Sequence, residues 1–239
     1  MIPLGQRPIL IEEAYRALLD EIAEGRLLPG QRVRQEELAS QLQVSRQPVS
    51  HALALLKQDG FLVDSGRRGL EVAPLDGDYL LASYQVRAAL DATAAGLAAR
   101  RVRDQGQERG VAKGLGEAEA ALERARRVAD PRRSDGTATT AFVQADMAFH
   151  QALNRLSGNP VLVETAERQW GHLRRAMHAV MASDYTAKTI LEEHAAILAA
   201  VRAGNPETAA VLAAGHAERA GTTTRARLIQ QQSNAKTPA

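Results

Sequence analysis

Apolar residues recur at the helical period in the first third of the chain. Between residues 9 and 24 they fall at positions 11, 14, 15, 18, 19 and 22, which predicts an amphipathic helix over 9–24. Shorter patterns predict a helix over 35–42 and, after a tight turn, a third helix from the N-cap residue Ser45 to Gly60. Two apolar runs flanking the turn 65–69 predict a β-hairpin. This order of elements is that of a winged helix-turn-helix module.

Beyond Asp78 the apolar pattern keeps the helical period. Turn signals divide this part into six predicted helices, over residues 78–103, 111–129, 139–157, 160–182, 187–203 and 206–230. The expected fold is mainly α: an N-terminal winged helix-turn-helix of three helices plus a β-hairpin, followed by an all-α antiparallel helical bundle. The expected domains are a DNA-binding module over 1–73, a linker over 74–78, a helical domain over 79–230 and a disordered tail over 231–239.

Composition narrows the possible chemistry. Aromatic side chains make up 3% of the 239 residues, which disfavours an all-β fold, and the absence of cysteine excludes disulfides and thiolate metal sites. The net charge is +2, but residues 1–75 contain nine basic and ten acidic residues, so a DNA-binding surface there depends on local placement of cations. Because the chain lacks a run of 18 apolar residues and a signal-peptide pattern, we expect a cytoplasmic protein with no membrane contact.

The third predicted helix is the one that would enter the major groove of DNA. Its N-terminal end offers an arginine that can pair with guanine, a glutamine that can read adenine and a serine that can reach phosphate. The predicted wing adds two arginines between glycines. The candidate DNA-binding residues are Arg34, Ser45, Arg46, Gln47, Ser50, His51, Arg67 and Arg68. The pattern alone also fits a small three-helix module that binds protein rather than DNA.

Three histidines and one aspartate stand where the predicted helices would otherwise place core residues. Asp146 and His150 are four residues apart and border an apolar stripe. His194 lies in an apolar row of its own predicted helix, and His216 follows Leu212 by one turn. Imidazole and carboxylate are good ligands for a divalent metal, with Zn expected and Ni, Mn or Fe as alternatives. The other interpretation is that each histidine is an ordinary hydrogen-bonded core residue.

Motifs in the first 73 residues resemble those of the GntR family of bacterial transcription regulators. The resemblance spans about residues 9–73 and rests on Gly25-Arg26-Leu27-Leu28-Pro29-Gly30, Glu37-Leu38-Ala39, Leu42-Gln43-Val44-Ser45-Arg46-Gln47-Pro48-Val49, Ala52-Leu53, Leu56, Asp59-Gly60 and Gly69. It implies that a homodimer binds double-stranded operator DNA with an inverted repeat. Two features depart from the family: Ser50 and His51 replace an arginine and an acid, and Glu36 replaces a frequent arginine.

The second part of the chain resembles the ligand-sensing FCD domain of the FadR subfamily, over about residues 78–230. The matching motifs are Asp146-Met147-Ala148-Phe149-His150, Gly158-Asn159-Pro160, Glu193-His194 with Ile197-Leu198 and Ala200, and His216. The resemblance implies that Asp146, His150, His194 and His216 bind a divalent metal, and that a small carboxylate effector occupies open positions on it. The six predicted helices, rather than seven, place the chain nearer the VanR-like branch.

The FCD domain usually opens with Arg-x-x-Leu-Glu, and this chain has Arg87-Ala88-Ala89-Leu90-Asp91. Arg87 is the candidate for holding the effector carboxylate, because a guanidinium pairs with a carboxylate through two hydrogen bonds. The alternative is an arginine that only pairs helices or faces solvent.

Three functional hypotheses follow. The leading one is a DNA-binding transcription regulator, a repressor, whose operator affinity is controlled by a small organic acid at the metal site of the C-terminal bundle. The second is a metal-dependent, hydrolase-like enzyme with an accessory helix-turn-helix, because an Asp/His₃ site with open positions could activate water. No further Glu or His stands in a motif position as a general base, so we do not expect an enzyme. The third is a dimeric module whose hairpin binds protein.

Overall fold

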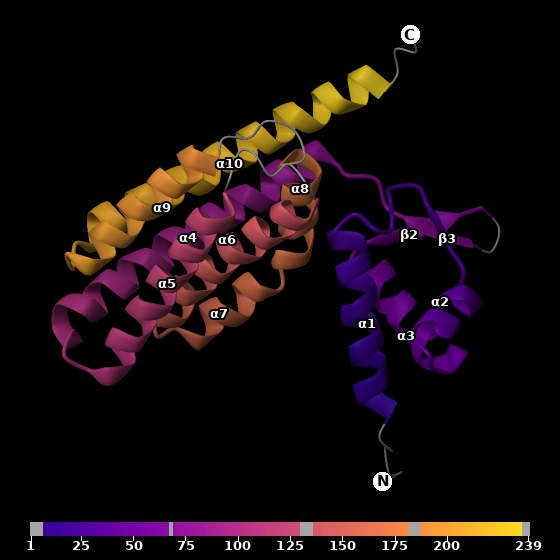
Figure 1. Cartoon of the computed structure of the whole chain (residues 1–239), viewed down its shortest axis with the longest axis horizontal. Helices are drawn as coiled ribbons and strands as arrows, with labels where there is room; N and C mark the ends of the chain where they lie inside the picture. Colours follow the sequence, from indigo (N-terminus) through magenta and orange to yellow (C-terminus); the bar gives the residue numbers. More distant parts are fainter. Residues whose placement is uncertain (1–6, 67–68, 130–135, 182–186, 236–239) are drawn as a thin grey trace. The chain divides into compact units, whose positions relative to one another are not determined.

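A computed structural model describes residues 7–66, 69–129, 136–181 and 187–235 (Figure 1). The chain divides into two compact units, residues 1–75 and 76–239, which are described separately. The second unit starts with α4, whose N-cap Asp76 accepts hydrogen bonds from the backbone N–H groups of Asp78 and Tyr79. This helix begins at Gly77, inside the stretch 74–78 for which we expected a linker.

In its described residues, the N-terminal unit consists of three helices and a three-stranded antiparallel sheet (Figure 1). Helix α1 (Arg7–Ala23) packs against α3 (Arg46–Gln58), and α2 (Gln35–Gln41) joins α3 through a tight turn. The strands lie in the order β1-β3-β2 and span Arg32–Val33, Leu62–Ser65 and Gly69–Val72 for β1, β2 and β3. The core draws on all three helices and the hairpin, and includes Leu18, Ile22, Leu38, Val49, Leu56, Leu62 and Val72. The expected winged helix-turn-helix is therefore confirmed.

Strand β1 was not expected from the sequence. It has two residues, Arg32 opposite Glu71 and Val33 opposite Leu70, and so short a strand leaves no alternating pattern to detect. Strands β2 and β3 pair as a hairpin at the predicted place, from Leu62 opposite Val72 onward. The two arginines expected near its tip, Arg67 and Arg68, lie outside the described residues.

The C-terminal unit is built from helices alone in its described part. The two long helices α4 and α10 lie side by side and antiparallel, because Gly77 of α4 faces Arg225 whereas Gly96 faces Pro206 (Figure 1). At their crossing Gly221 lies directly against Tyr84, where a Cβ atom would come within 2.6 Å of the Cβ of Tyr84. The helices span Gly77–Gln105 (α4), Arg109–Val128 (α5), Gly136–Leu156 (α6), Pro160–Glu167 (α7), Trp170–Met181 (α8), Ala187–Arg202 (α9) and Pro206–Ala235 (α10).

Two expectations about these helices are wrong. The helix predicted over 160–182 is two helices, because the chain turns at residues 168–169 before Trp170 buries its ring beside Tyr84 and Leu173. The described part of the unit therefore contains seven helices rather than six, which removes the basis for placing the chain nearer the VanR-like branch. Of the tail 231–239 that was expected to be disordered, residues 231–235 are helical, and residues 236–239 lie outside the described residues.

Candidate metal centre

Four polar side chains converge at the centre of the C-terminal unit. Asp146 and His150 lie one turn apart on α6, His194 comes from α9 and His216 from α10. All four are buried, with at most 3% of their surface exposed. One possible ligand atom from each lies within 4.8 Å of those of the other three. The residues predicted from helical periodicity are thus brought together by three separate helices.

The Nε2 atoms of the histidines face one another and the Asp146 carboxylate. His194 Nε2 lies 3.3 Å from His216 Nε2 and 3.5 Å from Asp146 Oδ1, and His150 Nε2 lies 4.0 Å from Asp146 Oδ2. Phe149 stacks on the His194 ring at a centroid distance of 4.2 Å and fixes its plane. Three imidazole nitrogens and a carboxylate around one point form the ligand set that Zn²⁺ and similar ions prefer.

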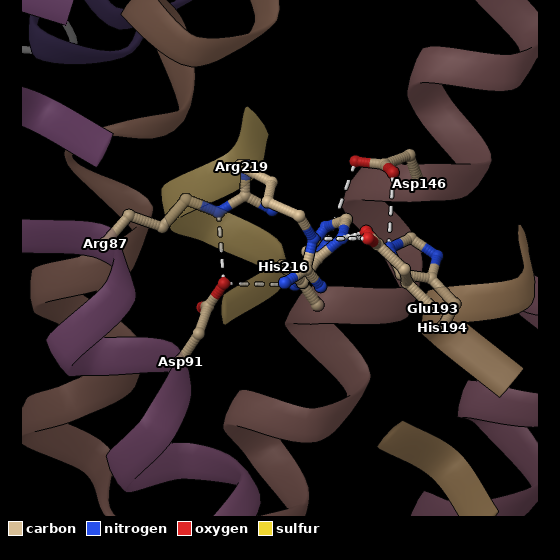
Figure 2. A network of polar contacts seen from close by, with 8 residues as sticks. Arg87, Asp91, Asp146, Glu193, His194, His216 and Arg219 are labelled. Carbon is tan, nitrogen blue, oxygen red and sulfur yellow. Dashed lines mark hydrogen bonds and ion pairs between the residues drawn. The ribbon is translucent and has the colours of Figure 1, made fainter. Parts of the chain in front are cut away.

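Two further carboxylates hold the outer nitrogens of these rings. Glu193 Oε2 lies 2.6 Å from His216 Nδ1, and its other oxygen accepts a 2.6 Å hydrogen bond from Arg219 Nε. On the opposite side, Asp91 Oδ2 lies 3.3 Å from His150 Nδ1 and accepts a 3.1 Å bond from Arg87 Nε (Figure 2). An Nδ1–H held by a carboxylate leaves the lone pair of Nε2 directed at the centre.

Sequence reasoning did not assign a role to Asp91 or Glu193. Each comes from a different helix than the histidine it contacts, so spacing along the chain gives no sign of the pair. The available signal was weak: Asp91 ends the Arg87-Ala88-Ala89-Leu90-Asp91 motif and Glu193 precedes His194. The two contacts could be predicted only once the packing of the helices was known.

Several buried polar atoms at this centre have no hydrogen-bond partner in the described structure. They include Asp146 Oδ2, His150 Nε2, His194 Nδ1 and Arg87 Nη2. A buried donor or acceptor left without a partner costs about 1–3 kcal/mol of stability. A cation among the four ligands would satisfy Asp146 Oδ2 and His150 Nε2 together. The donor set and its orphaned atoms therefore fit a bound metal ion.

Burial sets the charge states of these groups. Desolvation lowers the pKa of His150 and lowers the pKa of His194 still further, with Arg87 adding to the effect on both, so both rings are neutral as metal ligation requires. Burial alone would raise the pKa of Asp91, but His150 and Arg87 outweigh it and bring the pKa to about 2. Asp91 is therefore a carboxylate that can hold both partners at neutral pH.

A small cavity adjoins the candidate metal ligands. It has a volume of about 30 Å³, and Asp146, His216 and Arg87 contribute to its wall. Arg87 is 4% exposed and its guanidinium carbon lies 5.0 Å from the centroid of the Trp170 ring. The remaining lining residues are Tyr84, Met177, Val180, Met181, Ile190, Ala220, Thr223 and Thr224. Arg87 thus faces this cavity and is not exposed to solvent.

The described DNA-binding candidates are exposed polar residues at the start of α3, with Arg34 at the start of α2. Ser45 occupies the N-cap position of α3 but its side chain makes no capping hydrogen bond. Arg46 is paired with Glu36 of α2 at 2.9 Å, and Arg34 is paired with Glu37 at 3.1 Å. The other described candidates, Gln47, Ser50 and His51, are also exposed. Among the described contacts, the Ser45 side chain makes no capping hydrogen bond that would keep it from reaching a ligand.

Comparison with known protein families decides the class of protein. Residues 10–72 match the family of bacterial regulatory proteins called gntR, and residues 82–219 match the FCD domain. The chain belongs to the GntR family of bacterial transcription regulators. The GntR module coincides with the winged helix-turn-helix and the FCD match contains the four converging ligands, so this GntR regulator combines DNA binding with an FCD domain.

Individual GntR relatives agree with this assignment. The transcriptional regulator YdhC of Bacillus subtilis is 30% identical over 202 residues, which cover 82% of both chains. The probable D-xylose utilization operon transcriptional repressor of Paenarthrobacter nicotinovorans is 30% identical over 192 residues, covering 79% of this chain and 77% of that protein. The solved structure of E. coli McbR/YncC shares the fold, with a TM-score of 0.73 at 23% identity over 97% of this chain and 100% of that one.

Within the described residues, no helix combines the length and apolar character that crossing a bilayer requires.

The Glu193 carboxylate should strengthen metal binding through His216. We expect Glu193→Gln, which removes the charge but keeps an oxygen acceptor, to weaken Zn²⁺ binding by about tenfold or more, measured by competition with a chromogenic chelator. Glu192→Gln is the matched control, because the neighbouring side chain is exposed and pairs only with Lys188 among the described contacts. Equal affinity in the two variants would show that Glu193 does not support the centre.

The lowered pKa values of His150 and His194 predict a pH-dependent stability of the metal-free protein. As the pH falls below about 6.5, the unfolded chain binds protons that the folded centre excludes. The free energy of unfolding then decreases by about 1.4 kcal/mol per pH unit for each histidine kept neutral. We therefore expect the midpoint temperature of thermal unfolding to be lower at about pH 5.5 than at about pH 7.5.

His194→Gln should make this pH dependence shallower, whereas His51→Gln, an exposed substitution on α3, should leave it unchanged. Differential scanning calorimetry in the presence of a chelator measures the midpoints. A wild-type midpoint that does not change with pH would contradict the buried, neutral state of the two rings.

Proposed function

We propose that this GntR regulator is a repressor whose affinity for operator DNA is controlled by a small carboxylate bound beside a metal ion in the FCD domain. The supporting observation is the set of orphaned polar atoms, from Asp146, His150 and Arg87, buried around one centre and its adjoining cavity. Buried polar groups without partners are rare in folded proteins and point to a missing ligand. A metal and an anion together would satisfy these groups.

Asp146, His150, His194 and His216 are the proposed metal ligands, with Zn²⁺ the expected ion and Ni, Mn or Fe as alternatives. A divalent cation held there supplies positive charge and open coordination positions for an anionic ligand. The chain's own contribution is orientation: Glu193 and Asp91 hold two of the rings, and Phe149 packs on the third.

Arg87 is the proposed anchor for the effector carboxylate. Its Nε is used by Asp91, while its Nη2 is buried without a hydrogen-bond partner. A guanidinium nitrogen in that state is a charge-assisted donor available to an anion. Since Asp146 and His216 line the same cavity as Arg87, one ligand can face both the metal ligands and the guanidinium.

DNA recognition is proposed for the exposed start of α3 and for the wing. Arg46 would read guanine, Gln47 adenine, and Ser45, Ser50 and His51 would complete the surface. Arg34, Arg67 and Arg68 would contact the backbone of double-stranded operator DNA. A homodimer would place two such modules on an inverted repeat. Repression is proposed because relatives such as the NanR protein of Cronobacter sakazakii are named as repressors.

Helix α4 offers a direct covalent route from the effector to the DNA-binding unit. It begins at Gly77, immediately after that unit ends at Leu75, and it carries both Arg87 and Asp91. A ligand that pulls on Arg87 therefore acts on the helix that continues the chain from the winged module. For the effector to change operator affinity, α4 must have at least two placements, and these must differ in their affinity for the effector.

The proposal is tested by measuring the affinity of Zn²⁺-loaded protein for DNA from the region upstream of its own gene, by fluorescence anisotropy. Adding an organic acid that the protein binds should change the affinity of the wild type. The same acid should leave the DNA affinity of Asp146→Asn unchanged, because that variant replaces a carboxylate metal ligand by an amide of nearly the same volume. A response that is identical in the variant, or no response to any organic acid, would overturn the proposed control by a metal-bound effector.

Arg46 is predicted to contribute directly to operator binding. Arg46→Ala should cost about 1–3 kcal/mol of affinity for the operator, because an arginine that pairs with guanine contributes that much discrimination. Arg16→Ala on α1 is the matched control, since Arg16 is equally exposed in the same unit and pairs only with Glu12 in the described structure. Equal losses in the two variants would exclude a specific role for Arg46.

A further inference from the structure

The cavity beside the metal ligands has one cation in its described lining, and that cation is Arg87. The guanidinium is buried, and it lies between the rings of Tyr84 and Trp170, with its carbon 5.6 Å and 5.0 Å from their centroids. Asp91 accepts a hydrogen bond from its Nε, and its Nη2 has no hydrogen-bond partner among the described residues. Asp91 and the two rings therefore hold Arg87 in place, and its Nη2 is available to a ligand.

The buried charges around this cavity do not balance without a ligand. The proposed divalent ion contributes two positive charges and Arg87 a third, while Asp91 and Asp146 contribute two negative charges. Glu193 is paired with Arg219 and adds no net charge. The described groups thus leave one uncompensated positive charge in a buried site, which is strongly unfavourable until an anion neutralises it.

One monovalent anion would complete this balance. A dicarboxylate would reverse it, because its second charge would lie in the same buried site with no described cation left to pair with it. The charge count therefore distinguishes between classes of organic acid that the proposed function alone leaves open.

The walls of the cavity also restrict the rest of the ligand. Five of its lining residues are apolar: Met177, Val180, Met181, Ile190 and Ala220. Its volume of about 30 Å³ leaves room for a small ligand. The two methionines are flexible and can yield to a small group. The described lining offers three hydroxyl groups, from Tyr84, Thr223 and Thr224, and those of Tyr84 and Thr224 already pair with each other. A short hydrocarbon chain fits this wall better than a polyhydroxylated one.

Given the proposed function on which it rests, we infer that the effector is a monocarboxylate with a short aliphatic chain. Its carboxylate faces the Nη2 of Arg87 and the side of the cavity formed by Asp146 and His216. Its hydrocarbon chain lies against the apolar side chains of α8 and Ile190 of α9. Selectivity against dicarboxylates then comes from charge, and selectivity against sugar acids from the apolar wall.

Isothermal titration of Zn²⁺-loaded wild-type protein tests this inference with three probes. Butyrate and succinate have chains of equal length and differ by one carboxylate, and gluconate is a polyhydroxylated monocarboxylate. We expect butyrate to bind at least about tenfold more tightly than either of the other two, a difference of about 1.4 kcal/mol. Succinate binding as tightly as butyrate would overturn the charge argument, and gluconate binding more tightly would overturn the apolar wall.

If none of the three probes binds, and a wider panel of organic acids also fails to bind, the proposed carboxylate effector itself is wrong. If the panel contains a tight ligand with two or more carboxylates, the proposed function survives and the present inference fails. The two failures are therefore distinguishable in one experiment.

A charge-altering variant gives an independent check. Met181→Lys adds a second cation at a half-buried lining position, which should shift the preference from butyrate toward succinate. Val211→Lys, on the exposed side of α10, adds the same charge outside the cavity and should leave the preference unchanged. An unchanged preference in a folded Met181→Lys protein would contradict the charge argument. The wild-type comparison stands by itself if that variant does not fold.

Discussion

Three imidazoles and a carboxylate meet inside a helical bundle, where each polar atom left without a partner costs about 1–3 kcal/mol. Neighbouring side chains contact the outer side of each ring. Glu193 and Asp91 take up the outer nitrogens of two rings, Arg219 and Arg87 neutralise those carboxylates, and Phe149 covers the third ring. On the inner side of the cluster, Asp146 Oδ2 and His150 Nε2 have no hydrogen-bond partner among the described residues. That imbalance accounts for both the proposed cation and the proposed anion.

The same network places Arg87, the proposed effector anchor, on a helix that follows the DNA-binding unit along the chain. Arg87 and Asp91 lie one turn apart on α4, and their ion pair is buried. Because Asp91 also contacts His150, a change at Arg87 reaches the candidate metal ligands through two contacts, at 3.1 and 3.3 Å. In the DNA-binding unit, the Glu36 that departs from the family pattern pairs with Arg46 of α3. The arginine proposed to read guanine is therefore paired, in the described structure, with an acid at a position where the family often has an arginine.

Periodicity in the sequence located most of the helices and marked the four converging polar residues as core-facing, and the family resemblance pointed to a metal. The spacing of Asp146 and His150 by four residues fixes their common face, and His194 and His216 stand in apolar rows that can only face the core. The supporting carboxylates could not be found this way, because Asp91 and Glu193 reach across to histidines on other helices. Their partners depend on helix packing, which one sequence does not encode as a spacing.

The boundaries that sequence reasoning missed have a similar cause. The chain turns at residues 168–169 without proline or glycine, where tertiary burial of Trp170 overrides local helix preference. Strand β1 owes its existence to its neighbour β3, because two residues have no pattern of their own. The helix α10 extends to Ala235 although residues 231–234 are exposed and polar, so its end could not be read from an apolar stripe.

X-ray absorption spectroscopy of the Zn²⁺-loaded protein is the most direct test of the metal centre, because it reports the atoms bound to the metal. We expect a spectrum dominated by three imidazole ligands with additional oxygen, and the loss of one imidazole contribution in His194→Ala. A spectrum with one imidazole or none, or one that His194→Ala leaves unchanged, would contradict the assignment of Asp146, His150, His194 and His216 as a metal centre.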